Sequence, residues 1–187
     1  MKNLLTLFII LLINIDAYSQ CQSRYQNEIF SSTNKLTINY SDVYNDNAHK
    51  MDIYTGDGDT ATNRPLIIFH HGGSYYQGSK ENPGSVDFCT AFAKRGYVTG
   101  SIGYRLTSAA SLTDSLLMLE AVMNAISDSK AAVRYFRKDV VENGNIYAVD
   151  ADQIYFGGYS AGAIIAVNHA FIDDTDVLPT HLVDVVA

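Results

Sequence analysis

The stretch Ile154–Val167, IYFGGYSAGAIIAV, changes its pattern around a single serine, Ser160. Before the serine, Gln153–Gly158 is a short run rich in apolar residues that ends in two glycines, as is typical of a strand. After the serine, AGAIIAVNHAF contains no helix breaker beyond its first turn and has the length of a helix. The sequence therefore predicts a strand, a tight turn at Ser160 and a helix.

Such a turn needs small residues on both sides of the serine, because the strand and the helix approach each other closely. Gly158, Ala161 and Gly162 meet this need. The serine is then exposed above the carboxyl end of the strand, with the N-terminus of the helix pointing at the same place. The N–H of Ala161 is free there to donate to a negatively charged oxygen. The stretch therefore predicts a nucleophilic serine.

Strand and helix patterns alternate through the rest of the chain. Lys35–Tyr44 and His49–Thr55 alternate apolar and polar residues like antiparallel strands. Arg64–His70 is a continuous apolar run typical of a strand buried on both faces, and Gly96–Tyr104 is a weaker example. A helical pattern, SVDFCTAFAKRG, lies between these two runs and stops at its glycine.

A second and longer helical segment carries apolar residues that we expect to pack in the core: Leu112, Leu116, Leu119, Met123, Ile126, Val133 and Phe136. Strands that alternate with helices indicate one α/β domain. We expect a mostly parallel sheet with helices on both faces and antiparallel strands at its N-terminal side.

A glycine-rich turn follows the buried strand directly. It reads His70-His71-Gly72-Gly73-Ser74, within HHGGSYYQGS. Bare glycine-rich backbone offers fixed N–H groups, which stabilise the negative oxygen of a tetrahedral intermediate without having to reorganise. The turn therefore predicts an oxyanion-binding partner for Ser160.

The two motifs together resemble the α/β-hydrolase superfamily, and within it the esterase and lipase branch with an H-G-G-G turn, which is similar to hormone-sensitive-lipase-like enzymes and carboxylesterases. Four stretches carry the resemblance: KMDIYT, PLIIFHHGGSYYQGS, GYVTGSIGYRL and AVDADQIYFGGYSAG. By position, the resemblance makes Ser160 the nucleophile. It makes the N–H groups of Gly73, Ser74 and Ala161 the oxyanion hole, with Ser74 in place of the family's third glycine.

The resemblance also implies roles for the neighbouring residues. It assigns structural roles to His71, Gly72, Gly158 and Gly162, and a substrate pocket to Tyr75, Tyr76 and Tyr159. Tyr75 and Tyr76 are equally compatible with stacking in the core. The implied activity is hydrolysis of a small-molecule or carbohydrate-linked carboxylic ester, with no metal and no cofactor.

The base and the acid that such a serine needs are harder to find. In this fold the order along the chain is serine, then acid, then histidine, which argues against His70 and His71. His169 lies on the same predicted helix as Ser160, about 13 Å farther along its axis. His181 precedes the strand-like run LVDVVA, and we expect it in a loop. Asp173, Asp174 and Asp176 read as an acidic helix end.

We therefore expect the acid and the histidine beyond Ala187, and the sequence to be the N-terminal part of a longer domain whose last strands are missing. Such a piece should be poorly active by itself. Three alternatives remain: a serine peptidase, an acyltransferase, and a non-catalytic binding protein on the same fold. The presence of both motifs argues against the last of these, and the H-G-G turn favours ester hydrolysis.

The N-terminus indicates export. Lys2 precedes the apolar run Leu4–Ile13, and small residues at Ala17 and Ser19 have cleavage spacing. We expect a signal peptide at 1–19, a domain at 20–187, and a secreted or periplasmic protein. The alternative for the run is a buried N-terminal helix.

Export would allow a disulfide bond between Cys21 and Cys89, and the alternative is a free, buried Cys89. The net charge is −7 without any block of lysine or arginine, which argues against a nucleic-acid partner.

Overall fold

The computed structural model describes residues 23–172, which form one layered α/β unit. Its five-stranded sheet has the order β1-β2-β4-β3-β5. The strands are β1 (Thr33–Asn39), β2 (Lys50–Gly56), β3 (Arg64–His70), β4 (Val98–Ile102) and β5 (Val149–Gly158). The helices are α2 (Pro83–Ala93), α3 (Ser115–Glu142) and α4 (Ala161–Phe171), with a short 3-10 helix η1 (Ala109–Leu112) before α3.

The sheet is mixed within the described residues. β1 pairs with β2, and β2 with β4, in antiparallel register, whereas β3 lies parallel to both β4 and β5. The expected antiparallel start of the sheet is therefore confirmed, and the parallel part is its three-stranded other half. β3 is the central strand of this half, and all seven of its residues are buried, as its continuous apolar run predicted.

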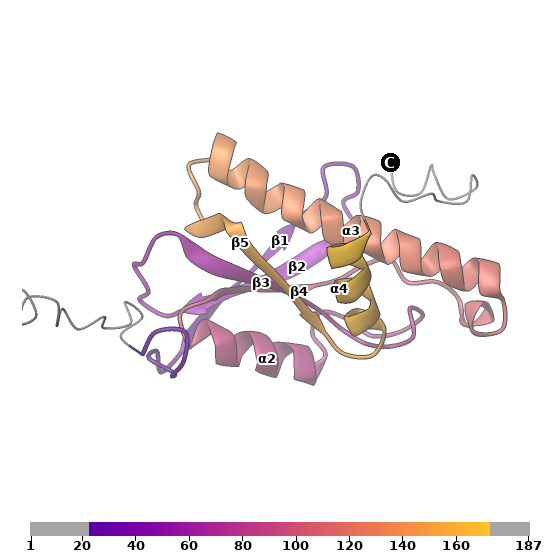
Figure 1. The fold of residues 1–187 in the computed structure, drawn as a ribbon, viewed down its shortest axis with the longest axis horizontal. Coiled ribbons are helices and arrows are strands. Elements are labelled where there is room, and N and C mark those ends of the chain that lie inside the picture. Colours follow the sequence, from indigo (N-terminus) through magenta and orange to yellow (C-terminus); the bar gives the residue numbers. More distant parts are fainter. Residues whose placement is uncertain (1–22, 173–187) are drawn as a thin grey trace, which may run out of the picture.

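Helices cover both faces of the sheet (Figure 1). α2 lies on one face, and α3 and α4 lie on the other. Leu66 and Ile68 of β3 pack in one core cluster with Phe136 of α3, and Phe69 packs in another cluster with Cys89 of α2. Alternate residues of β3 thus face opposite helices, because successive side chains of a strand point to opposite faces.

Local signals set the helix ends. Pro83 is the first residue of α2, where its missing N–H costs nothing. Gly96, with φ +95°, follows the end of α2 and donates its N–H to the carbonyl of Ala93 at 2.9 Å. The side chain of Asp114 caps α3 by accepting the N–H groups of Leu116 and Leu117. The glycine stop expected from the sequence is confirmed.

The prediction that the whole apolar stripe packs in the core is wrong at its N-terminal end. Phe136, Ile126, Met123 and Val133 are buried, but Leu112, Leu116 and Leu119 are exposed, Leu116 by 63%. The reason is the length of α3. Its 28 residues span about 42 Å, so the N-terminal turns of α3 extend past the sheet, as Figure 1 shows.

Cys89 is a free, fully buried thiol in α2, and burial raises its pKa to about 12. Its proposed partner Cys21 and the expected signal peptide at 1–19 lie outside the described residues, so both remain predictions. Within residues 23–172 we find no helix that is long and apolar enough to cross a membrane.

The two ends of α3 give a stability prediction. Phe136→Ala should lower the free energy of unfolding by about 3–5 kcal/mol, because it leaves a cavity under the sheet. Leu116→Ala, on the exposed end, should change it by less than about 0.5 kcal/mol. Urea unfolding followed by circular dichroism measures both. Equal losses would mean that the N-terminal end of α3 is packed after all.

Candidate active site

Ser160 lies in the turn between β5 and α4 with a backbone conformation that is rare for any residue except glycine. Its φ is 54° and its ψ is −125°. This conformation is strained for an L-residue and persists only where the surroundings impose it. The expected sharp strand-to-helix turn at Ser160 is therefore present, and the serine is the residue immediately before α4.

Two glycines make this turn sterically possible. A Cβ on Gly162 would lie 2.1 Å from the carbonyl oxygen of His70, and a Cβ on Gly158 would lie 2.5 Å from the backbone of Gly162. Real Cβ contacts are never this short, so α4 can begin against the end of β3 only because both residues lack a side chain. The sequence prediction that Gly158 and Gly162 are structural agrees with this packing.

The glycine-rich turn after β3 is also held in an unusual backbone conformation. Gly73 has φ 129°, and Ser74 and Tyr75 have φ 51° and 63°. The carbonyl of Gly73 accepts the N–H groups of Tyr76 and Gln77 at 3.2 and 3.1 Å, which closes the turn. Among the described residues, the N–H groups of Gly73 and Ser74 have no main-chain acceptor of their own, so they are free to donate to a bound group.

The serine turn and the glycine-rich turn line the same cavity of about 440 Å³. Its walls are Gly72, Gly73, Ser74, Gln77, Gly78, Asn82, Tyr159 and Ser160. Ala161 is the first residue of α4, where helical N–H groups have no partner in the preceding turn. The structure thus brings the predicted nucleophile and the predicted oxyanion donors to one place.

Three of the cavity residues were not foreseen from the sequence: Gln77, Gly78 and Asn82. Gln77 and Gly78 belong to the stretch HHGGSYYQGS that contains the glycine-rich turn, so the length of this stretch could have indicated that they lie near the site. Asn82 lies just before α2, and its side chain approaches the hydroxyl of Tyr159 at 3.4 Å. No local pattern marks this residue, because only the fold brings α2 next to the serine turn.

The three tyrosines assigned to the substrate pocket have different positions. Tyr159 lines the cavity and is 44% exposed. Tyr75 is buried in a core cluster with Tyr104 and Ala161, and its hydroxyl donates to the carbonyl of Ala161 at 3.3 Å. Tyr76 does not line the cavity. The structure therefore favours the packing alternative for Tyr75 and leaves Tyr159 as the aromatic wall.

His71 supports the glycine-rich turn. Its Nδ1 lies 2.7 Å from the carbonyl oxygen of Gly72, and its ring stacks on Tyr104 at 4.2 Å. The hydroxyl of Tyr104 in turn donates to the carbonyl of His71 at 2.8 Å. Burial lowers the pKa of His71, so its ring is neutral near pH 7. These contacts fit the structural role expected for this residue.

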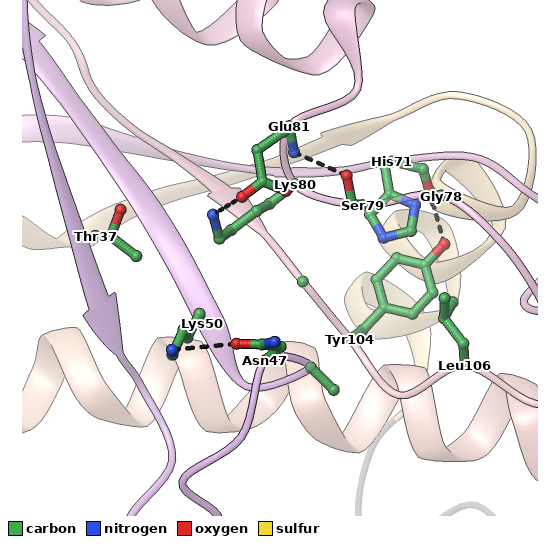
Figure 2. Close-up of a pocket in the computed structure, with 12 residues that line it drawn as sticks. Thr37, Asn47, Lys50, His71, Gly78, Ser79, Lys80, Glu81, Tyr104 and Leu106 are labelled. Carbon is green, nitrogen blue, oxygen red and sulfur yellow. Dashed lines mark hydrogen bonds and ion pairs between the residues drawn. The ribbon is translucent and has the colours of Figure 1, made fainter.

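A second cavity, of about 580 Å³, lies next to the first, and Gly78 lines both. Figure 2 shows His71 and Tyr104 on one side of it and the paired Lys80 and Glu81 on another. Lys80 also pairs with the buried Asp52 at 3.0 Å. Burial opposes the charge on Asp52, but hydrogen bonds from Thr37 and Lys80 keep its pKa below the usual value.

No histidine within residues 23–172 lines the cavity at Ser160, and the four in this range are His49, His70, His71 and His169. The histidine His181 and the aspartates Asp173, Asp174 and Asp176 lie outside the described residues. The described part of the chain therefore holds a strained serine and its candidate oxyanion donors, but no group placed to accept the serine's proton.

Taken together, the sheet order, the helices on both faces and the strained serine turn between β5 and α4 define an α/β-hydrolase fold. The chain belongs to the BD-FAE family, whose model matches residues 51–186. The finer resemblance to hormone-sensitive-lipase-like enzymes stays a prediction. No curated protein matched the chain.

Solved esterases share the fold. The thermophilic esterase Est2 of Thermogutta terrifontis is 25% identical, with a TM-score of 0.57 over 76% of this chain and 46% of that one. Esterase B of Lactobacillus rhamnosis is 20% identical, with a TM-score of 0.56 over 90% and 48%. A truncated carbohydrate esterase from gut microbiota is 21% identical, with a TM-score of 0.53 over 75% and 43%. The chain thus spans less than half the length of these proteins.

The packing of the serine turn predicts a large effect of one methyl group. Gly162→Ala should lower the free energy of unfolding by about 3 kcal/mol or more, because the new Cβ would collide with the backbone of His70 and His71. Gly84→Ala is a matched control: Gly84 is likewise the second residue of its helix, and a Cβ there meets only Tyr159, at 3.8 Å. The control should be neutral or stabilised by up to about 1 kcal/mol. Similar urea midpoints for the two variants would contradict the close approach.

The buried histidines predict a dependence of stability on pH. The pKa of His70 is lowered to about 4, mainly by burial and in smaller part by the neighbouring His169 and His71, whereas the hydrogen bond to the carbonyl of Gly157 opposes this shift. Burial also lowers the pKa of His169 to about 4, helped by Lys130, Arg137 and Arg134 of α3. Between pH 6.5 and 4 these histidines bind protons in the unfolded chain but not in the folded chain. Their contribution to the free energy of unfolding is therefore fully present above pH 6.5 and decreases as the pH falls.

We therefore expect the free energy of unfolding to be smaller at pH 5 than at pH 7.5, with His70 contributing on the order of 2 kcal/mol to the difference. His70→Asn should show a correspondingly smaller difference in urea unfolding. Carboxylates such as Asp52 and Asp59, whose pKa values are lowered, stay ionised at both pH values and do not interfere. An unchanged pH difference in the variant would show that His70 titrates normally.

Proposed function

We propose that this chain carries the nucleophile and the oxyanion hole of a secreted serine hydrolase that cleaves carboxylic esters through an acyl-Ser160 intermediate. The observation that carries the proposal is the single cavity that Ser160 shares with Gly73 and Ser74. The strained backbone of Ser160 supports it, since such strain is costly and concentrates at functional sites. Esterases among the fold neighbours support it as well.

The chemistry would run in two halves. The Ser160 hydroxyl attacks the ester carbonyl while a base takes its proton, and the N–H groups of Gly73, Ser74 and Ala161 stabilise the oxygen that becomes negative. The intermediate collapses, the alcohol leaves with the proton, and the acyl group stays on Ser160. Water then attacks the acyl group by the same route and releases the acid. We assign the base to a histidine, oriented by a carboxylate, from outside the described residues.

The walls of the cavity indicate the class of ester. Gln77, Asn82 and the hydroxyl of Tyr159 present polar groups beside Ser160. Such walls suit a short acyl group and a polar alcohol better than a long lipid chain, because polar side chains lose hydrogen bonds to water when apolar groups cover them. A carbohydrate-linked ester fits this requirement, and carbohydrate esterases occur among the structural neighbours.

The test is hydrolysis of p-nitrophenyl acetate by the natural protein. Ser160→Ala should lower kcat at least about a thousandfold, because the acyl-enzyme can no longer form. Ser115→Ala, which changes an exposed serine at the start of α3, should leave kcat unchanged. Undiminished activity in Ser160→Ala would remove the assignment of the nucleophile.

A second substrate separates the ester hydrolase from the peptidase alternative. The matching N-acetyl p-nitroanilide presents the same acyl group with an amide in place of the ester. The activated ester reacts faster than the anilide with any acyl-serine enzyme, so the readout is turnover of the anilide itself. An ester hydrolase should not cleave it measurably. Cleavage of the anilide that is lost in Ser160→Ala would favour a serine peptidase, and transfer of acetate to an added alcohol in preference to water would favour an acyltransferase.

A further inference from the structure

Three polar side chains from different elements form a chain of hydrogen bonds beside the serine turn. Nδ1 of His70, at the end of β3, lies 3.0 Å from the carbonyl oxygen of Gly157. Its Nε2 lies 2.8 Å from Oγ of Ser129 in α3, and the same Oγ lies 2.6 Å from Nδ1 of His169 in α4. His70 and Ser129 are fully buried.

One carbonyl fixes every proton in this chain. The oxygen of Gly157 can only accept, so Nδ1 of His70 carries the hydrogen, and Nε2 of the neutral ring is an acceptor. The single hydroxyl proton of Ser129 must then go to His70, which leaves its oxygen to accept from Nδ1–H of His169. Burial keeps both rings neutral near pH 7, as the lowered pKa values indicate. The chain therefore has a fixed direction, from α4 through α3 to β3 and β5.

The hydrogen-bond chain includes residues of both elements that flank Ser160. Gly157 belongs to β5, which leads into the serine turn, and His169 belongs to α4, which leaves it. His70 is the last residue of β3 and the first residue of the glycine-rich turn. Phe156 of β5 stacks on His169 at 4.0 Å, which gives this ring a second fixed contact. One serine of α3 thus ties the nucleophile turn and the oxyanion turn together.

The hydrogen bonds among His70, Ser129 and His169 contribute little to stability by themselves. Folding exchanges hydrogen bonds with water for these internal ones, so the net gain is small, and apolar side chains could fill the same space. Hydrogen bonds are directional, so they fix the relative positions of the elements that carry them, which apolar packing does not do. None of the three side chains lines the cavity at Ser160, so none of them would touch a substrate there.

We propose that His70, Ser129 and His169 are positioning residues that set the distance between Ser160 Oγ and the oxyanion N–H groups. This inference rests on the ester hydrolysis proposed above. The distance matters in the transition state, where charge develops on the substrate oxygen, and much less when the substrate merely binds. Removing one of these hydrogen bonds should therefore lower kcat and leave KM nearly unchanged.

The test uses Ser129→Ala in the natural protein, with active sites counted by reaction with a p-nitrophenyl phosphonate. We expect kcat per active site for p-nitrophenyl acetate to fall about 10- to 100-fold, because small misplacements of reacting groups cost this much. KM should stay within about twofold, and phosphonylation, which builds a tetrahedral adduct in the same oxyanion hole, should slow in parallel. Ser85→Ala is the matched control, since Ser85 is a buried serine whose hydroxyl has no partner among the described residues. It should keep its kcat.

A double-variant cycle separates positioning from a general loss of structure. His169→Phe keeps an aromatic ring against Phe156 but removes the donor to Ser129. If the residues act as one chain, Ser129→Ala with His169→Phe should be no slower than Ser129→Ala alone, whereas independent structural defects would multiply. Ser129→Thr, which restores a hydroxyl, should recover part of kcat. If Ser129→Ala does not fold, the split between kcat and KM in His169→Phe decides the question.

The outcomes distinguish this inference from the function on which it rests. An unchanged kcat in Ser129→Ala, in a protein that Ser160→Ala inactivates, would overturn the positioning role and leave the hydrolase standing. Multiplying defects in the double variant would overturn it too. A natural protein that neither cleaves esters nor reacts with the phosphonate at Ser160 would overturn the proposed function itself.

Discussion

The contact on which the site depends is the approach of Gly162 to the carbonyl oxygen of His70. It places the first turn of α4 directly against the end of β3, at a distance that any Cβ would prevent. The chain can make this contact only by turning sharply after β5, and the turn forces Ser160 to a positive φ. The strain at the serine is thus the consequence of a packing constraint, and it is compensated by the burial of β3 between the helices on the two faces of the sheet.

The parallel pairing of β3 and β5 explains why the two halves of the site meet. β3 lies parallel to β5 in the sheet, so both strands deliver their following turns to the same edge. The turn after β3 carries the free N–H groups of Gly73 and Ser74, and the turn after β5 carries Ser160. Because Gly157 and Gly158 are paired in register with Phe69 and His70, a shift of one residue in either strand would separate the two turns.

Local sequence patterns predicted most of the fold and five of the eight residues that line the cavity at Ser160. β3 and α4 were found at their observed bounds, since a continuous apolar run and a breaker-free helix are local signals. The exposed N-terminal turns of α3 were not predicted, because periodicity marks an apolar face without showing where the sheet ends. Asn82 and the hydrogen-bond chain through Ser129 were missed for a related reason. Their partners are far away in the sequence, and only the folded chain brings them together.

The buried histidines illustrate the difference between a histidine that acts as a catalytic base and one that has a structural role. A histidine serves as a base only where its free nitrogen faces a reacting group and its pKa lies near the working pH. His70 and His71 have one ring nitrogen against a carbonyl oxygen, and burial lowers the pKa of both. Their value to the site lies in that neutrality, because a ring that keeps one tautomer keeps one set of hydrogen bonds. In the ester hydrolysis proposed above, such a frame would keep Ser160 and the N–H groups of Gly73 and Ser74 in place while charge develops on the substrate oxygen.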